Sequence, residues 1–186
     1  MKKLIKILII LIILLSIYFV FFKVRIDKVI MKKIYPLKYT EYVEKYSREY
    51  NIDKYLVYAI IKAESNFNEN AKSNSNAIGL MQIMESTAIE TAQKMGQVIT
   101  EEDLFKPDLN IKIGLKYYST LLEKYENNYQ MAIIAYNAGI GNVDKWIQDG
   151  IIEKDGSNLE NVPFKETNNY LRKIVRDYEI YKKIYN

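Results

Sequence analysis

One glutamate in this 186-residue chain occupies a position where a carboxyl group could act as an acid. Leu56, Ile60 and Phe67 are separated by steps of four and seven, so in a helix they share one face. Glu64 falls four residues after Ile60 and three before Phe67, which places it in this apolar stripe. Loss of hydration there raises the pKa of a carboxyl group and suits general acid catalysis. The alternative is a structural glutamate at the edge of the core, paired with a lysine such as Lys72.

The absence of histidine and cysteine limits the chemistry further. The chain has no imidazole base, no thiolate nucleophile and no Cys/His zinc site, so acid–base chemistry must rest on Asp, Glu, Lys or Tyr. We therefore expect no metal and no cofactor. Residues 1–33 carry a net charge of +7, whereas the whole chain carries a formal charge of +4. The rest of the chain is thus slightly acidic, which argues against nucleic acid as a partner.

The elements that must position Glu64 are expected to be helices. Beyond residue 39 the apolar residues recur at spacings of three and four, and we find no convincing alternating strand and no repeat. Asp53 can cap the helix that carries Glu64, and Thr167 can cap the last helix. The Asn- and Ser-rich segment 66–76 is expected to be a loop. Further helices are expected over 86–95, 108–125, 129–137 and 142–148. The sequence predicts an all-α domain over residues 39–186.

An apolar segment precedes this domain. Sixteen uncharged residues run from Ile7 to Phe22, and the segment reaches nineteen residues when it is counted from Leu4 with Lys6 inside it. A helix of that length spans roughly 30 Å, the thickness of a bilayer core. No small-residue cleavage site follows the segment, and there is no cysteine for a lipid anchor. The sequence predicts one uncleaved transmembrane signal-anchor over residues 1–23 and a basic stalk over 24–38.

Four motifs follow one another in the expected helical domain. They are Glu64-Ser65-x-Phe67, Gly79-Leu80-Met81-Gln82, Ala135-Tyr136-Asn137-Ala138-Gly139 and Pro163-Phe164-x-Glu166-Thr167-x-x-Tyr170. Between the second and third stands the segment Leu104-Phe105-x-Pro107-x-x-Asn110-x-x-x-Gly114. Each motif alone is weak, but their identity, order and spacing together resemble the catalytic domain of soluble-lytic-transglycosylase-type enzymes. The resemblance covers roughly Tyr46 to Tyr178 and implies a lysozyme-like, goose-type-like helical fold.

The resemblance also implies an activity. Enzymes of this family cleave the β-1,4 bond between N-acetylmuramic acid and N-acetylglucosamine in peptidoglycan and leave a 1,6-anhydro end, without water in the bond-breaking step. Their catalytic glutamate matches Glu64, which would donate a proton to the leaving oxygen and then accept one from the C6 hydroxyl of the sugar. One carboxyl group can serve as acid and then base. The expected partner is a glycan strand of peptidoglycan.

The same resemblance implies substrate-binding positions. They are Ser65, Gly79, Met81, Gln82, Tyr136, Asn137, Glu166 and Tyr170. Gly79 would let the chain turn or let a sugar approach the backbone. Met81 would offer an apolar wall, and Gln82 would offer an amide. Tyr170 matches a tyrosine whose hydroxyl reaches the catalytic carboxyl group. Glu166 would meet peptide or acetamido groups of the substrate, with a plain surface glutamate as the alternative.

Two other functions are left open. A hydrolase of the goose-type lysozyme kind would need a second carboxylate about 6.5–9.5 Å from Glu64 to activate water. The candidates for it are Glu69, Glu85, Asp103 and Glu166. An inactive, membrane-tethered glycan-binding scaffold is the other alternative.

The location of the domain follows from the expected substrate. Peptidoglycan lies outside the cytoplasmic membrane, so we expect a single-pass membrane protein whose catalytic domain faces the wall. The basic residues that follow the apolar segment favour the opposite orientation by the positive-inside rule. The expected orientation therefore rests on the function and not on charge.

Overall fold

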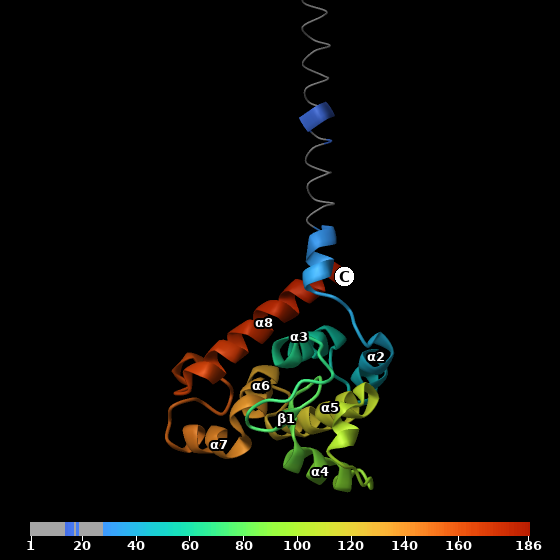
Figure 1. Ribbon diagram of the computed structural model, residues 1–186. Coiled ribbons are helices and arrows are strands. Elements are labelled where there is room, and N and C mark those ends of the chain that lie inside the picture. Colours follow the sequence, from blue (N-terminus) through green and yellow to red (C-terminus); the bar gives the residue numbers. More distant parts are fainter. Residues whose placement is uncertain (1–13, 17, 19–27) are drawn as a thin grey trace, which may run out of the picture. The chain divides into compact units, whose positions relative to one another are not determined.

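Figure 1 shows a computed structural model of the chain, which describes residues 14–16, 18 and 28–186. The chain divides into two compact units. The larger unit is Leu37–Lys183, and the smaller combines residues up to Pro36 with the last three residues. The described part of the smaller unit contains a short helix over 28–34. Within it the hydroxyl of Tyr185 donates a hydrogen bond to the carbonyl oxygen of Tyr35 at 2.7 Å.

The predicted transmembrane helix over 1–23 lies outside the described residues, apart from positions 14–16 and 18. In the part of the chain that is described, no helix combines the length and the apolar character needed to cross a membrane. The boundaries at 1–23, 24–38 and 39–186 therefore stay sequence predictions.

The larger unit is mostly helical, as the sequence predicted. Its elements in chain order are α2 (Thr40–Glu49), α3 (Lys54–Ser65), β1 (Ala77–Ile78), β2 (Ile83–Met84), α4 (Glu85–Lys94), the 3-10 turn η1 (Glu102–Phe105), α5 (Pro107–Lys124), α6 (Tyr129–Ala138), α7 (Ile140–Gln148), the 3-10 turn η2 (Leu159–Asn161) and α8 (Lys165–Tyr185, whose last two residues belong to the smaller unit). The expected helices are all present with ends shifted by a few residues. Such shifts are common because helix ends are set by local capping contacts.

Helix α3 runs through the core of the unit. Asp53 caps it as predicted, because its side chain accepts a hydrogen bond from the backbone N–H of Tyr55 at 2.8 Å. All residues from Tyr55 to Ile61 are buried, so the first two turns are covered on every side and not only along one stripe. The helix ends where Asn66 and Phe67 both adopt left-handed backbone conformations. This end carries Glu64.

A two-stranded antiparallel hairpin follows α3, in a segment where no strand was expected from the sequence. Ala77 pairs with Met84 and Ile78 with Ile83, and residues 79–82 form the turn. The expectation of a purely α domain is therefore wrong in this segment. Two residues per strand are too few for an alternating pattern to be visible in the sequence. Ile78 and Ile83 are nonetheless buried, and they join the core cluster with residues of α4 and α5.

The buried side chain of Asn110, on α5, holds the hairpin turn. Its Nδ2 donates to the carbonyl oxygens of Ile78 at 2.9 Å and Leu104 at 2.8 Å, and its Oδ1 accepts from the N–H of Met81 at 2.8 Å. An added Cβ on Gly79 would collide with the amide of Asn110. The chain therefore needs glycine at position 79 for close packing as well as for its left-handed backbone, with φ of +75°.

Helix α8 begins earlier than predicted. It starts at Lys165, so Thr167 lies inside the first turn and is not the N-cap. The side chain of Thr167 is buried, and its hydroxyl donates to Oδ1 of Asn137 at 2.7 Å. The prediction that Thr167 caps α8 is therefore wrong. The threonine hydroxyl forms a hydrogen bond between α8 and α6 instead of one within α8.

Replacing Gly79 by alanine should lower the free energy of unfolding by about 3 kcal/mol. A left-handed backbone costs a residue with a Cβ about 1–2 kcal/mol, and forcing an extra carbon into the packed turn costs about 1–3 kcal/mol more. Gly96 is the matched control, since its φ is +69° and an added Cβ there meets nothing within 4 Å. Gly96→Ala should therefore cost only about 1–2 kcal/mol. Denaturant unfolding followed by the fluorescence of Trp146, the single tryptophan, measures both. Equal losses would contradict the packing role of Gly79.

Candidate active site

Glu64 lies in the last turn of α3 and is only partly accessible to water. Burial raises the pKa of its carboxyl group from the ordinary value of 4.5 to about 7. A hydrogen bond from Tyr170 and the positive charge of Lys173 act in the opposite direction, but burial is the larger effect. The carboxyl group can therefore be protonated near neutral pH and can lose that proton readily, as a general acid must.

The hydroxyl of Tyr170 donates a hydrogen bond to Oε1 of Glu64. The contact joins residues 106 positions apart in the chain. Burial next to the carboxyl group raises the pKa of Tyr170 well above its ordinary value, so the phenol remains a donor. The expected contact between Tyr170 and the Glu64 carboxyl group is thus present in the structure.

One face of α8 runs along α3 and keeps Tyr170 in place. Lys173, one turn after Tyr170, donates from Nζ to the carbonyl oxygen of Ala63 at 3.1 Å. Further along, the hydroxyl of Tyr178 donates to the carboxylate of Asp53 at 3.0 Å. The two helices are therefore joined near both ends of α3. Sequence reasoning missed Lys173, although its position three residues after Tyr170 places both on one helix face.

The alternative partner that the sequence offered for Glu64 is wrong. Lys72 forms an ion pair with Glu101 instead. The cation that acts on Glu64 is Lys173, which comes from α8 and not from the loop after α3.

The hairpin turn lies beside the end of α3. The hydroxyl of Ser65 donates to the carbonyl oxygen of Leu80 at 2.8 Å, and the hydroxyl of Tyr136 donates to that of Met81 at 2.8 Å. The side-chain amide of Gln82 donates to the carbonyl oxygens of Ala71 and Gly79 at 3.1 and 3.0 Å. These contacts bring the first three motifs together and fix the shape of the turn.

Met81 does not have the environment expected of a cleft wall. Its side chain is fully buried and packs against Gly114 of α5, where an added Cβ would lie 2.6 Å from its sulfur. The glycine and the methionine thus form one close contact in the core. The neighbouring Met84 is exposed, and it offers the apolar surface that the sequence assigned to Met81.

The other predicted residues lie on α6 and α8. Tyr136 packs its ring against those of Tyr117 and Tyr118, with centroids 5.6 and 6.1 Å apart. Asn137 accepts the hydrogen bond from Thr167 that joins α6 to α8. Glu166 is exposed in the first turn of α8. The structure thus brings most of the predicted positions together around one end of α3, whereas no contact found among the described residues ties Glu166 to this site.

A cavity of about 240 Å³ lies next to these residues. Gln82, Tyr136, Asn137, Met84 and Tyr117 are among the side chains that line it. Three of the five were predicted from the sequence. Met84 and Tyr117 were missed, because their exposure at the cavity depends on how the hairpin and α5 meet. Aromatic rings, amides and an apolar thioether together suit a ligand with both polar and apolar faces.

The raised pKa of Glu64 should be visible in the stability of the protein. Its carboxyl group has a folded-state pKa of about 7 and an ordinary value of 4.5, so the stabilisation from the protonated form is present below pH 4.5 and is lost as the pH rises through 7. The free energy of unfolding should fall by ~3 kcal/mol between pH 4.5 and 8, and Glu64→Gln should remove most of this slope.

Asp103→Asn is the control for this measurement. Hydrogen bonds from Lys106 and Thr100 hold the pKa of Asp103 at about 2, so that carboxylate stays ionised across the whole range. The variant should keep the wild-type slope. A Glu64→Gln variant with the wild-type slope would contradict the buried, protonated carboxyl group.

Comparison with known proteins gives relatives for this arrangement. Residues 41–155 match the family model of the transglycosylase SLT domain. A soluble lytic murein transglycosylase of Salmonella typhimurium is 34% identical over 149 residues, which cover 78% of this chain and 23% of the relative. A membrane-bound lytic murein transglycosylase C of Pectobacterium atrosepticum is 40% identical over 117 residues, 57% of this chain and 32% of the relative. The chain thus spans less than a third of the length of these curated relatives.

Solved structures have the same fold. The 70 kDa soluble lytic transglycosylase of Escherichia coli superposes with a TM-score of 0.74 at 28% identity over 82% of this chain and 25% of that one. The complex of the 70 kDa soluble lytic transglycosylase with bulgecin A superposes with a TM-score of 0.76 at 30% identity, again over 82% of this chain and 25% of that one. A third structure is an inactive mutant of the lytic transglycosylase of Pseudomonas aeruginosa, in which glutamine replaces a glutamate. It superposes with a TM-score of 0.74 at 31% identity over 80% of this chain and 24% of that one. The lysozyme-like helical fold expected from the motifs is confirmed. The match over residues 41–155, more than half of the chain, shows that the chain belongs to the transglycosylase SLT domain family.

Proposed function

We propose that this chain is a peptidoglycan lytic transglycosylase. It cleaves the β-1,4 bond between N-acetylmuramic acid and N-acetylglucosamine and leaves a 1,6-anhydro end on the muramic acid. Membership of the SLT family and relatives named lytic murein transglycosylases support this function. The observation that carries it is the partly buried Glu64, with a pKa of about 7 and a hydrogen bond from Tyr170.

The proposed reaction uses Glu64 twice. The protonated carboxyl group donates its proton to the glycosidic oxygen as the bond from that oxygen to C1 breaks. The C6 hydroxyl of the same muramic acid then attacks C1, and the Glu64 carboxylate accepts the hydroxyl proton. The carboxyl group returns to its starting state and no water is consumed. A pKa near neutrality suits both steps, because neither protonation state is strongly disfavoured.

The surroundings of Glu64 favour this single-residue mechanism over hydrolysis. Among the described residues, the groups that shift its pKa besides burial are Tyr170 and Lys173, and no carboxylate is among them. Two candidates for a second carboxylate are engaged elsewhere: Asp103 with Lys106 and Thr100, and Glu69 with the hydroxyl of Tyr39. Tyr170 and Lys173 would stabilise the Glu64 carboxylate in the moment between its acid and base steps.

The cavity of about 240 Å³ is the proposed glycan cleft. Glu64 does not line it directly, but its charge acts on Tyr136, which does. Met84 and the ring of Tyr136 offer apolar surface to the faces of the sugars. Gln82 uses its amide nitrogen within the turn, so its carbonyl oxygen is the atom we assign to substrate. For Met81 we propose a packing role, and for Ser65 and Asn137 we propose that they position the cleft through their contacts with Leu80 and Thr167.

The mass of the products tests the proposed reaction. Full-length chain in detergent should release muropeptides from purified peptidoglycan that are roughly 18 Da lighter than the reducing-end forms, because the sugar's own hydroxyl replaces water. Glu64→Gln should abolish release while the protein stays folded, and Glu85→Gln should behave as wild type. Products with reducing ends would instead identify a hydrolase. An active Glu64→Gln variant would rule out the proposed acid.

We also propose that residues 1–23 anchor the chain in the cytoplasmic membrane, with the catalytic domain on the wall side. The apolar segment from Leu4 to Phe22 and the membrane-bound relative from Pectobacterium atrosepticum support this proposal. The full chain should remain in the membrane fraction after alkaline carbonate washing. Protease added to intact spheroplasts should digest the domain. Release of the chain by carbonate would contradict the membrane anchor. A catalytic domain that is protected from the protease would contradict the proposed orientation.

A further inference from the structure

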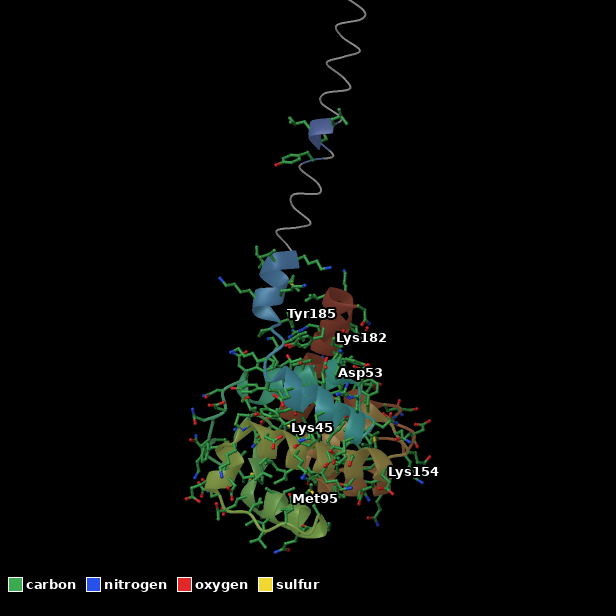
Figure 2. All side chains as sticks on the ribbon, turned by 90° about the vertical axis from the view of Figure 1, so that its right-hand side faces the viewer. Lys45, Asp53, Met95, Lys154, Lys182 and Tyr185 are labelled. Carbon is green, nitrogen blue, oxygen red and sulfur yellow. The ribbon has the colours of Figure 1, made fainter. Side chains whose placement is uncertain are left out.

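A continuous groove with both polar and apolar lining lies on the larger unit away from Glu64. It consists of three adjoining cavities of about 470, 270 and 490 Å³. Asn51 and Asp53 line both the first and the second cavity, and Asn127 and Tyr129 line both the second and the third. Figure 2 labels Asp53 together with Lys154, which lines the third cavity. We call these three cavities the polar groove.

The polar groove and the Glu64 site lie at different points along the same helices. On α3, Asp53 caps one end and Glu64 lies at the other, about 16 Å away at 1.5 Å per residue. On α8, Tyr178 of the groove lies about 12 Å along the helix from Tyr170. On α6, Tyr129 begins the helix that carries the active-site residues at its other end. The groove is therefore separate from the proposed glycan cleft.

The groove contains polar side chains that the fold leaves unpaired. Ser47 lines the first cavity and is 5% exposed, yet its hydroxyl has no hydrogen-bond partner among the described residues. A buried hydroxyl without a partner is unusual in a folded protein and points to a ligand or water. The side chains of Asn51 and Asn127 are exposed and take part in none of the side-chain hydrogen bonds found in the described part of the chain, so both amides are open to a ligand.

Several charged groups of the groove are paired within the protein, but Arg48 of the first cavity and Asp155 of the third form no ion pair among the described residues. Glu44 pairs with Lys54 at 3.0 Å, and Glu126 pairs with Lys154 at 3.1 Å. Asp53 accepts hydrogen bonds from the backbone of its own helix and from Tyr178. The rest of the lining combines amides and aromatic rings with apolar side chains such as Ile52, Leu56 and Leu122. Such a mixed surface suits a ligand that has apolar faces as well as hydroxyl and amide groups.

We propose that the polar groove is a second saccharide-binding site, which holds an N-acetylated stretch of glycan strand while Glu64 acts on another. The ring of Tyr129, which meets that of Tyr178 edge to face at 6.0 Å, provides apolar surface for the C–H faces of sugars. One face of the Tyr178 ring is covered by Nζ of Lys182 at 4.4 Å. The amides of Asn51 and Asn127 can pair with acetamido and hydroxyl groups. The identity of the saccharide rests on the proposed function, since peptidoglycan is the glycan that such an enzyme would meet.

Two separate contacts with one insoluble polymer would raise the apparent affinity for the wall. Once either site is occupied, the other meets a high local concentration of glycan. The groove therefore acts on binding to sacculi and not on the chemical step. Short soluble fragments, which reach only one site at a time, should be cleaved without its help.

A triple variant, Ser47→Ala with Asn51→Gly and Asn127→Gly, tests the groove. Glycine replaces the two asparagines because their φ values are +53° and +63°. In full-length chain carrying Glu64→Gln to prevent cleavage, the triple variant should sediment with purified sacculi with about tenfold weaker affinity. Asn158→Gly is the matched control, with φ of +62° at a position that lines none of the three cavities, and it should bind like the parent.

With Glu64 intact, the triple variant should cleave short soluble glycan fragments at the wild-type rate. Binding to sacculi equal to that of the parent would overturn the groove proposal. A wild-type chain that cleaves nothing, although the triple substitution still weakens sacculus binding, would instead overturn the proposed function and leave the groove standing.

Hydrogen exchange tests the groove without changing it. Glycan strands freed of peptide, added to the Glu64→Gln chain, should slow amide exchange in segments 50–55 and 126–131 as well as in 79–84. The first two segments contribute to the groove, and the third is the turn beside Glu64. Protection confined to 79–84 would overturn the proposal even if the triple variant failed to fold.

Discussion

The arrangement of this domain depends on taking one carboxyl group, that of Glu64, partly out of water. Burial alone would hold the carboxyl group neutral so firmly that it would be a poor proton donor. The hydroxyl of Tyr170 and the charge of Lys173 partly offset burial, and the pKa settles at about 7. Both opposing groups come from α8, so the acid is poised only when α8 lies along α3. The Lys173 contact with Ala63 and the Tyr178 contact with Asp53 hold that pairing.

The hairpin turn beside Glu64 depends on close packing from α5. Asn110 makes three hydrogen bonds to backbone groups around the turn, and Gly79 leaves room for its amide. Gly114 does the same for Met81. Several residues that form short motifs in the sequence thus serve to bring backbones together. The surface beside the acid is then shaped by their neighbours, including Gln82 and Met84.

The same helices that position the acid also fix its distance from the polar groove. Helices are stiff, so α3 and α8 hold two regions of the surface roughly 12–16 Å apart. Nothing in the linear sequence groups Ser47, Asn51 and Asn127, which come from α2 and from the turns before α3 and α6. Their common feature is the lack of side-chain partners in the described structure. That feature can be recognised only when the neighbours of each side chain are known.

The sequence by itself determined the features that depend on residues within about four positions of each other. The apolar stripe around Glu64, the Asp53 cap and the helices are local, because helical periodicity and capping are local. The order of the motifs further indicated the fold and the role of Tyr170 through a family resemblance. The short hairpin could not be predicted from the sequence, because a strand of two residues is too short to show an alternating apolar pattern.

Only the tertiary structure decided which partners distant residues choose. Lys72 pairs with Glu101 and not with Glu64, Thr167 bonds to Asn137 instead of capping α8, and Met81 is buried. Each outcome depends on elements that approach from far along the chain, as Tyr170 approaches Glu64 across 106 positions. The pKa of Glu64 belongs to the same class, because water is excluded from a side chain by the whole packed domain and not by its sequence neighbours.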